Sequence, residues 1–98
     1  MERGGSVYIM TNRNKTTLYI GVTSDLSERI QQHKEHFYKK SFSNKYNLEY
    51  LIYYENLPTI EEAIAREKEI KKWRREKKEN LINSINPEWR DLWAEIQD

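Results

Sequence analysis

The chain of 98 residues has no cysteine, two histidines, three glycines and two prolines. The lack of cysteine excludes disulfides, thiolate metal sites and cysteine nucleophiles, and two histidines are too few for a zinc site built on several imidazoles. No apolar run approaches the ~18 residues of a membrane span, and no basic segment followed by an apolar one opens the chain. We therefore expect a single soluble, cytoplasmic domain over residues 1–98 that does not contact a membrane.

The remaining composition leaves a disordered chain as an alternative, because only 37% of the residues are hydrophobic and 34% are charged. Twelve aromatic residues in patterned segments argue against disorder. The net charge of +1 hides an uneven distribution, since residues 66–78 hold eight basic and three acidic side chains whereas residues 79–98 hold one and five. This distribution predicts a positive stripe on a nearly neutral domain.

Three β-rich runs are expected to form the sheet. The runs at 7–10 and 17–22 flank a polar turn and predict a hairpin, and a third strand is predicted at 48–55. If the hairpin has a two- or four-residue loop centred on Arg13 and Asn14, Tyr8 and Tyr19 lie directly opposite each other. The alternative interpretation is that the two tyrosines are ordinary sheet residues.

Helices are expected between and after these strands. One is capped by Ser24 or Asp25 and ends near residue 36, and a longer one begins at Thr59 and ends near Lys78 or beyond. Asp25 and Thr59 each precede a glutamate by three residues, which is the pattern of a capping box. A short final helix is expected over 87–96, with Trp89, Leu92 and Trp93 on one face. The element order β-β-α-β-α-α predicts an α+β fold, a small three-stranded antiparallel sheet flanked by helices.

Ionisable residues stand on the apolar faces of both main helices. Arg29 and His33 lie one turn apart on the face of the first helix that carries Leu26 and Ile30. Each residue has a structural alternative to a functional role. His33 is then a hydrogen-bonded core histidine, and Arg29 reaches out of the core and pairs with a carboxylate.

Glu67 breaks the apolar stripe of the longer helix in the same way, because it lies between Ala63 and Ile70 on one face. A carboxylate in that position needs a base, a hydrogen-bond donor or a metal ion as its partner. The alternative is a stripe-edge glutamate paired with an arginine.

Lysines between residues 34 and 45 add to the basic run at 66–78. Phe37, Tyr38 and Phe42 are interleaved with these lysines, as in surfaces that contact phosphates and stack on bases. The alternative interpretation of the basic run is a solvated helix face whose charges form salt bridges with one another. The candidates for contact with nucleic acid are Lys34, Lys39, Lys40, Arg66, Lys71, Lys72, Arg74, Arg75 and Lys78.

Taken together, these residues resemble the GIY-YIG nuclease domain. Ser6, Val7 and Tyr8 stand at its first motif, and Tyr19, Ile20 and Gly21 match the second motif eleven residues later. Arg29 matches the arginine that the family carries ten residues after the second tyrosine, and His33 matches the histidine one turn later. Glu67 matches the glutamate in the helix after the third strand. Small stand-alone bacterial members, which resemble the N-terminal nuclease domain of the excision-repair protein UvrC, are the most similar.

The resemblance implies a metal-dependent endonuclease that hydrolyses phosphodiester bonds in DNA, in repair or recombination. It implies one divalent ion, Mg²⁺ or Mn²⁺, on Glu67, and charge neutralisation on the phosphate by Arg29. Tyr8 would orient or deprotonate the attacking water with His33 as proton acceptor, and Tyr19 would position water or phosphate.

Other features of the resemblance keep alternatives open. The asparagine that members carry after the glutamate corresponds to Asn80 or Asn86. Ser6 replaces the glycine of the first motif, and Val22 replaces the lysine that several members carry after the second. Because of these two departures, the alternative function is that of a nucleic-acid-binding module or subunit with weak catalytic activity. DNA is the expected partner in preference to RNA, and a protein partner or a transient dimer remains open.

Overall fold

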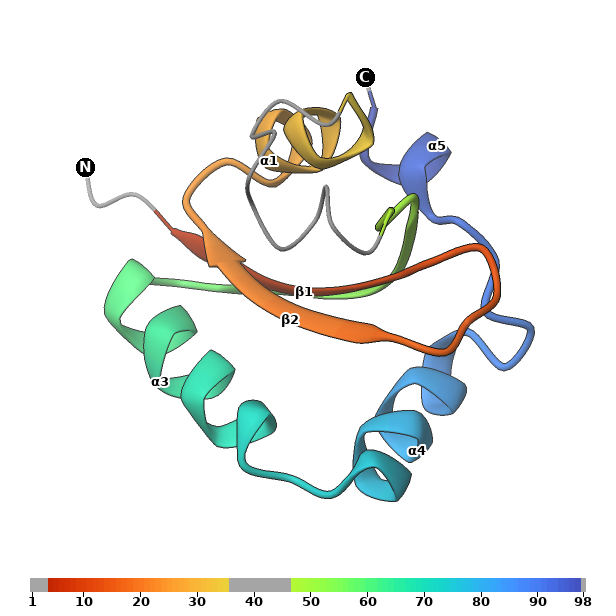
Figure 1. Ribbon diagram of the computed structural model, residues 1–98. Coiled ribbons are helices and arrows are strands. Elements are labelled where there is room, and N and C mark those ends of the chain that lie inside the picture. Colours follow the sequence, from red (N-terminus) through yellow and green to blue (C-terminus); the bar gives the residue numbers. More distant parts are fainter. Residues whose placement is uncertain (1–3, 36–46, 98) are drawn as a thin grey trace.

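The computed structural model describes residues 4–35 and 47–97. Its strands are β1 (Gly5–Thr11), β2 (Leu18–Thr23) and β3 (Tyr50–Leu57), which form one sheet in the order β2-β1-β3 (Figure 1). Both pairings are antiparallel. The third strand begins and ends two residues later than predicted, while the predicted α+β class and element order are confirmed.

Helices cover both faces of this sheet. The helices are α1 (Leu26–Lys34), α3 (Ile60–Lys71), α4 (Arg75–Ile85) and the short α5 (Trp93–Ile96). In Figure 1, α1 and α5 lie on one face, and α3 and α4 on the other. The strand residues alternate between the two layers, as the two-residue period of a strand requires: Val7 and Ile9 pack with α3 and α4, whereas Tyr8 and Met10 pack with α1. None of the helices described is long and apolar enough to cross a bilayer.

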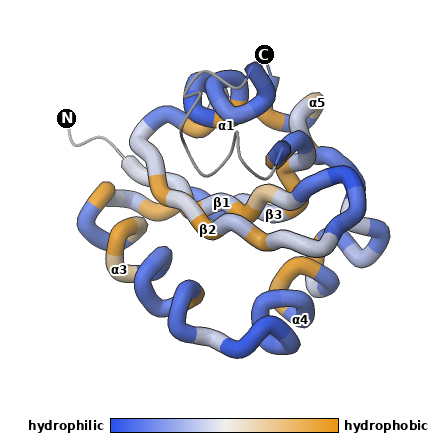
Figure 2. The backbone as a smooth tube through the Cα atoms, in the orientation of Figure 1, coloured by the Kyte–Doolittle hydropathy of each residue, from blue (hydrophilic) through white to orange (hydrophobic). Residues whose placement is uncertain are grey.

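The two predicted helix starts are confirmed. The Asp25 carboxylate accepts a hydrogen bond from the Glu28 amide at 3.2 Å, and the Thr59 hydroxyl accepts one from the Glu62 amide at 3.2 Å. Each cap satisfies an amide that the first helical turn leaves without a partner. Hydrophobic residues alternate with hydrophilic ones along α1 and α3 (Figure 2), and Ile30 of α1 and Ile70 of α3 are buried in the two layers of the core.

The prediction of one continuous helix from Thr59 to Lys78 is wrong, because the helix is interrupted between Lys71, where α3 ends, and Arg75, where α4 begins. A straight helix from residue 60 to residue 85 would be ~39 Å long, whereas eight residues of β3 span only ~26 Å. The break lets Ile70 and Ile82 both reach the same core, where Trp73 also packs. Burial of apolar side chains from both segments therefore outweighs the local preference for a longer helix.

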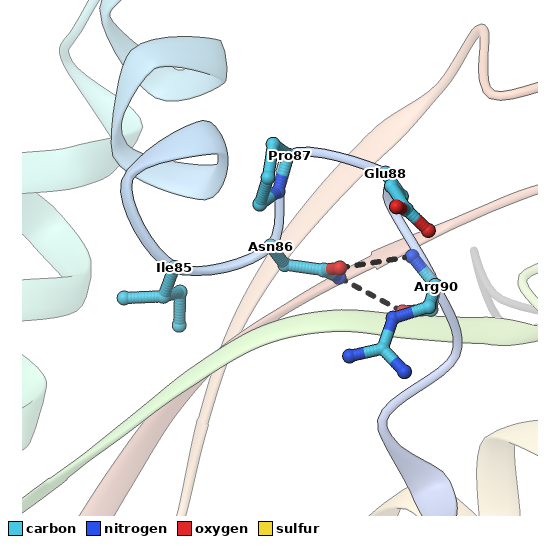
Figure 3. Close-up of a pocket in the computed structure, with 5 residues that line it drawn as sticks. All are labelled: Ile85, Asn86, Pro87, Glu88 and Arg90. Carbon is cyan, nitrogen blue, oxygen red and sulfur yellow. Dashed lines mark hydrogen bonds between the residues drawn. The ribbon is translucent and has the colours of Figure 1, made fainter.

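The predicted helix over 87–96 is also shorter than expected, and only α5 forms. The Asn86 side chain shapes residues 86–90 into a loop: it accepts a hydrogen bond from the Arg90 amide at 3.0 Å and donates to the Arg90 carbonyl at 2.9 Å (Figure 3). Trp89, with φ of 55°, then packs into the α3–α4 layer. Leu92 and Trp93 pack into the α1 layer, so the three side chains do not share one face.

Asn86 is therefore expected to contribute more to stability than Asn80. Its side chain is buried and also donates to the Ile52 carbonyl of β3 at 3.0 Å. Asn86→Ala leaves buried backbone groups without partners and should lower the free energy of unfolding by about 2–4 kcal/mol. Asn80→Ala, at an exposed position, should change it by less than about 0.5 kcal/mol. Urea unfolding of both variants measures the difference, and equal effects would contradict this account.

Candidate functional site

The two motif tyrosines meet on the face of the sheet that α1 covers. Tyr8 pairs with Gly21 and Tyr19 with Met10, so the prediction that the tyrosines stand directly opposite is wrong. The hairpin loop is longer than predicted, because the last pair is Thr11 with Leu18 and the loop covers residues 12–17. A shift of two residues keeps every side chain on its face. The tyrosines are therefore diagonal neighbours, with ring centroids 6.1 Å apart.

His33 of α1 completes this aromatic group. Its Nε2 lies 2.9 Å from the Tyr8 hydroxyl, and its ring centroid lies 5.3 Å from that of Tyr19. The Tyr8 ring lies over β2 at Gly21, where an added Cβ would come within 2.3 Å of Tyr8 Cζ. The glycine of the second motif is thus required for the buried position of the Tyr8 ring.

Burial controls the protonation of the group. Removal from water raises the pKa of the Tyr8 phenol above its ordinary value, and the neighbouring Tyr19 raises it further, whereas the charge and hydrogen bond of Arg29 oppose the rise. Burial, and then the positive charge of Arg29, lower the pKa of His33 to about 4. A neutral His33 can accept the Tyr8 hydroxyl proton at Nε2. Among the residues described, its buried Nδ1 has no hydrogen-bond partner.

Arg29 lies one turn before His33 on α1 and is partly exposed. Its charge influences the pKa values of both Tyr8 and His33, so the guanidinium stands beside the phenol and the imidazole. The structure thus brings together four of the predicted site residues, which are Tyr8, Tyr19, Arg29 and His33.

Glu67 is in the other layer, on α3. Its side chain is 13% exposed and forms an ion pair with Lys71 at 3.1 Å, not with an arginine. It stands between the buried Ala63 and Ile70 on the side of α3 that packs on the sheet. In the part of the chain described, no group of three or more histidine, aspartate or glutamate side chains is arranged to hold a metal ion. In these residues Glu67 is therefore a single carboxylate, on a helix that packs on β1 and on the edge strand β2.

Comparison with known proteins places the chain in a family. Residues 4–80 match the family model of the GIY-YIG catalytic domain. The chain belongs to the GIY-YIG family. This GIY-YIG domain is 33% identical over 82 residues to a UPF0213 protein from Syntrophus aciditrophicus, with 84% of the chain and 92% of that protein covered. The solution NMR structure of a UPF0213 protein from Bacillus halodurans is similar with a TM-score of 0.57 and 25% identity, and covers 97% of this chain and 99% of its own.

Several basic residues predicted to contact nucleic acid have partners within the GIY-YIG domain. Lys34 donates to the Glu49 carbonyl and to Asp91, each at 2.6 Å, and so ties α1 to the chain before α5. Arg66 pairs with Glu55 at 2.7 Å and with Glu69. Both contacts raise the pKa of the Arg66 guanidinium. These two residues hold the fold together as well as carrying charge.

The other basic candidates differ in their surroundings. Lys71 pairs with Glu67, and Arg75 is bound to Glu79 and to the hairpin loop. Lys72 and Arg74 are exposed and Lys78 is half-buried, while the predicted contacts Lys39 and Lys40 lie outside the described residues. The role of Arg75 in holding the loop was not predicted, because the loop lies about 60 residues away in sequence.

The buried His33 gives the domain a pH-dependent stability. Since its folded pKa of about 4 lies below the ordinary 6.5, the unfolded chain takes up the proton first as the pH falls. The stabilising contribution is complete above pH 6.5 and is lost as the pH falls towards 4. The free energy of unfolding should therefore fall by about 3 kcal/mol between pH 7 and pH 4 from this group alone.

Urea unfolding of the wild type and of His33→Gln at both pH values isolates this contribution from that of the carboxylates, which titrate in both proteins. We expect the wild type to lose more stability than the variant. The same pH dependence in both proteins would mean that folding does not lower the pKa of His33.

Proposed function

We propose that this GIY-YIG domain is a metal-dependent endonuclease that hydrolyses phosphodiester bonds in DNA. The observation that carries the proposal is the hydrogen bond between Tyr8 and a neutral, buried His33, next to the Arg29 guanidinium. This arrangement supplies a hydroxyl, a proton acceptor and a fixed positive charge at one place. Groups of these kinds can activate water and neutralise charge on a phosphodiester.

Tyr8 and His33 act on the attacking water. An unperturbed tyrosine, with a pKa near 10, is a poor base at neutral pH, and burial makes the Tyr8 phenolate still less accessible. His33, which is neutral near pH 7, would accept the phenol proton at Nε2 while the Tyr8 oxygen takes a proton from water. The oxygen of the water forms the new bond to phosphorus as the bond to the leaving ester oxygen breaks.

Arg29 and Tyr19 act on the phosphate. The planar guanidinium of Arg29 presents several donors at fixed angles to the phosphate oxygens, where negative charge develops. Tyr19 is partly buried beside Tyr8, and its hydroxyl would position the water or a phosphate oxygen.

The residues fit a single hard cation held by one carboxylate. Glu67 is a carboxylate of low exposure whose partner, the Lys71 ammonium, is 53% exposed and free to turn into water. Glu67 would hold Mg²⁺ or Mn²⁺, with water and phosphate oxygens completing the coordination. When bound, such an ion polarises the phosphate and stabilises the leaving oxygen.

A catalytically weak nucleic-acid-binding module is the second candidate. It is favoured by the complete burial of Tyr8, and by Ser6, which stands at the glycine of the first motif and donates to Asn56 Oδ1 at 2.6 Å. In this role the aromatic group is part of the core, and the basic surface carries the function.

A cleavage assay on labelled flapped, nicked, single-stranded and duplex DNA, with matched RNA, separates the two candidates. We expect cutting of at least one DNA with Mg²⁺ or Mn²⁺ and none with EDTA. Tyr8→Phe should slow cutting while Tyr50→Phe, a tyrosine of β3 outside the group, should not. Binding without cutting in either metal would favour the second candidate.

A further inference from the structure

The hairpin loop at residues 12–17 has a fixed shape. The Asn12 side chain accepts hydrogen bonds from the amides of Thr16 and Thr17 at 2.9 and 3.1 Å and donates to the Thr16 hydroxyl at 2.8 Å. The Lys15 amide closes the turn by donating to the Asn12 carbonyl at 2.9 Å, with Lys15 at φ of 59°. The side chains of Arg13 and Lys15 are exposed at the tip of this rigid loop.

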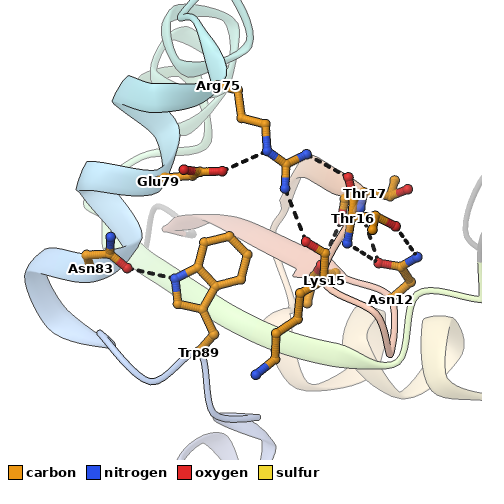
Figure 4. Close-up of polar contacts among 9 residues, drawn as sticks. Asn12, Lys15, Thr16, Thr17, Arg75, Glu79, Asn83 and Trp89 are labelled. Carbon is orange, nitrogen blue, oxygen red and sulfur yellow. Dashed lines mark hydrogen bonds and ion pairs between the residues drawn. The ribbon is translucent and has the colours of Figure 1, made fainter.

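Arg75, the first residue of α4, fastens the loop to the helix (Figure 4). Its guanidinium donates to the Thr16 carbonyl at 2.6 Å and to the Lys15 carbonyl at 3.2 Å, while its Nε donates to Glu79 at 2.8 Å. All three nitrogens of the group are therefore engaged. An arginine used in this way is poorly placed to bind phosphate itself.

This attachment brings cations from distant parts of the chain together. Arg74 precedes Arg75 directly, and Lys78 follows one turn later on α4. Arg13 and Lys15 lie on the loop that Arg75 holds, and Figure 4 shows the Lys15 side chain extending away from the guanidinium. We call these four residues the loop–helix surface. None of the four has an ion-pair partner among residues 4–35 and 47–97.

We propose that the loop–helix surface, Arg13, Lys15, Arg74 and Lys78, binds the phosphate backbone of nucleic acid, and that Arg75 is the positioning residue that assembles it. The proposal rests on the proposed function for the identity of the polyanion. Because α4 covers the face of the sheet opposite to α1 (Figure 1), this surface would bind phosphates other than the one that Arg29 neutralises.

Binding of duplex DNA in EDTA, at a series of salt concentrations, tests the surface without cleavage. Each lost phosphate contact should reduce the slope of log K against log salt by about 0.9. Arg13→Ala with Lys15→Ala, and Arg74→Ala with Lys78→Ala, should each reduce the slope by about 1–2. Arg90→Ala removes an exposed arginine outside the surface and should leave the slope unchanged.

Arg75→Lys tests the positioning role, because lysine keeps the charge and loses the fork of donors. We expect weaker DNA binding and faster hydrogen exchange at the Thr16 and Thr17 amides, in a variant whose thermal unfolding shows that it is folded. Wild-type affinity with wild-type exchange would overturn the role of Arg75.

Cleavage by the surface variants separates this proposal from the proposed function. Variants of the four surface residues should need a higher DNA concentration than the wild type to reach half-maximal cutting. If the wild type cuts DNA but the surface variants keep the wild-type salt slope, only the proposed surface is overturned. No binding and no cutting by the wild type would overturn both proposals.

Discussion

Glu67→Gln is expected to abolish metal-dependent cleavage while the domain stays folded. Glutamine has nearly the same shape as glutamate, but it carries no negative charge to hold a divalent ion. The ion pair with Lys71 is of the type that contributes about 0.3–0.5 kcal/mol on a helix surface. The variant also removes a charge from a position that is 13% exposed, where desolvation is unfavourable. The free energy of unfolding should thus change by less than about 1 kcal/mol.

Cleavage with Mg²⁺ and thermal unfolding, measured on the same preparation, check this expectation. Glu61→Gln is the matched control, because Glu61 is an exposed glutamate in the first turn of the same helix. Cutting that survives Glu67→Gln would mean that Glu67 is not the metal ligand or that a contaminant cuts. Loss of folding in Glu67→Gln would make the carboxylate a structural partner instead.

Arg29→Ala is expected to lower turnover by about 10²–10³-fold, which is typical of a removed group that stabilises transition-state charge. Arg29→Lys should restore only part of the loss, because an ammonium lacks the planar fork of donors. Removal of the positive charge should also raise the pKa of His33 from about 4, since Arg29 lowers it, but burial still holds that pKa below its ordinary value.

The rate profile of Arg29→Ala between pH 6 and 8 should therefore keep the wild-type shape at a lower level, because guanidinium does not titrate in this range. Single-turnover cleavage over this range measures both the loss and the shape. Arg90→Ala should cut like the wild type. A wild-type rate in Arg29→Ala would place the charge that acts on phosphate elsewhere.

The local chemistry of the chain is enough to predict the three strands, the starts of two helices and the faces on which Tyr8, Arg29 and His33 lie. Asp25 and Thr59 cap helices because their side chains satisfy amides within three residues. Alternation along β1 places Tyr8 on one face regardless of register, since a strand repeats every two residues. The helical period does the same for Arg29 and His33 on α1. These features depend on neighbours in sequence, which is why patterns predict them.

Only the tertiary structure decided the features that depend on distant segments. The hairpin register follows from a six-residue loop closed by Asn12. The break after Lys71 follows from the competition between helix continuity and burial of Ile82 on the sheet.

The partners of charged side chains were decided in the same way. Lys34 and Arg75 look like free cations in the sequence, yet each binds a carbonyl more than ten residues away. Such contacts form only when the chain has folded, because residues far apart in sequence must first be brought together against the entropy of the loop between them. Composition therefore predicted how much positive charge the domain carries, and packing determined which of those charges face the solvent.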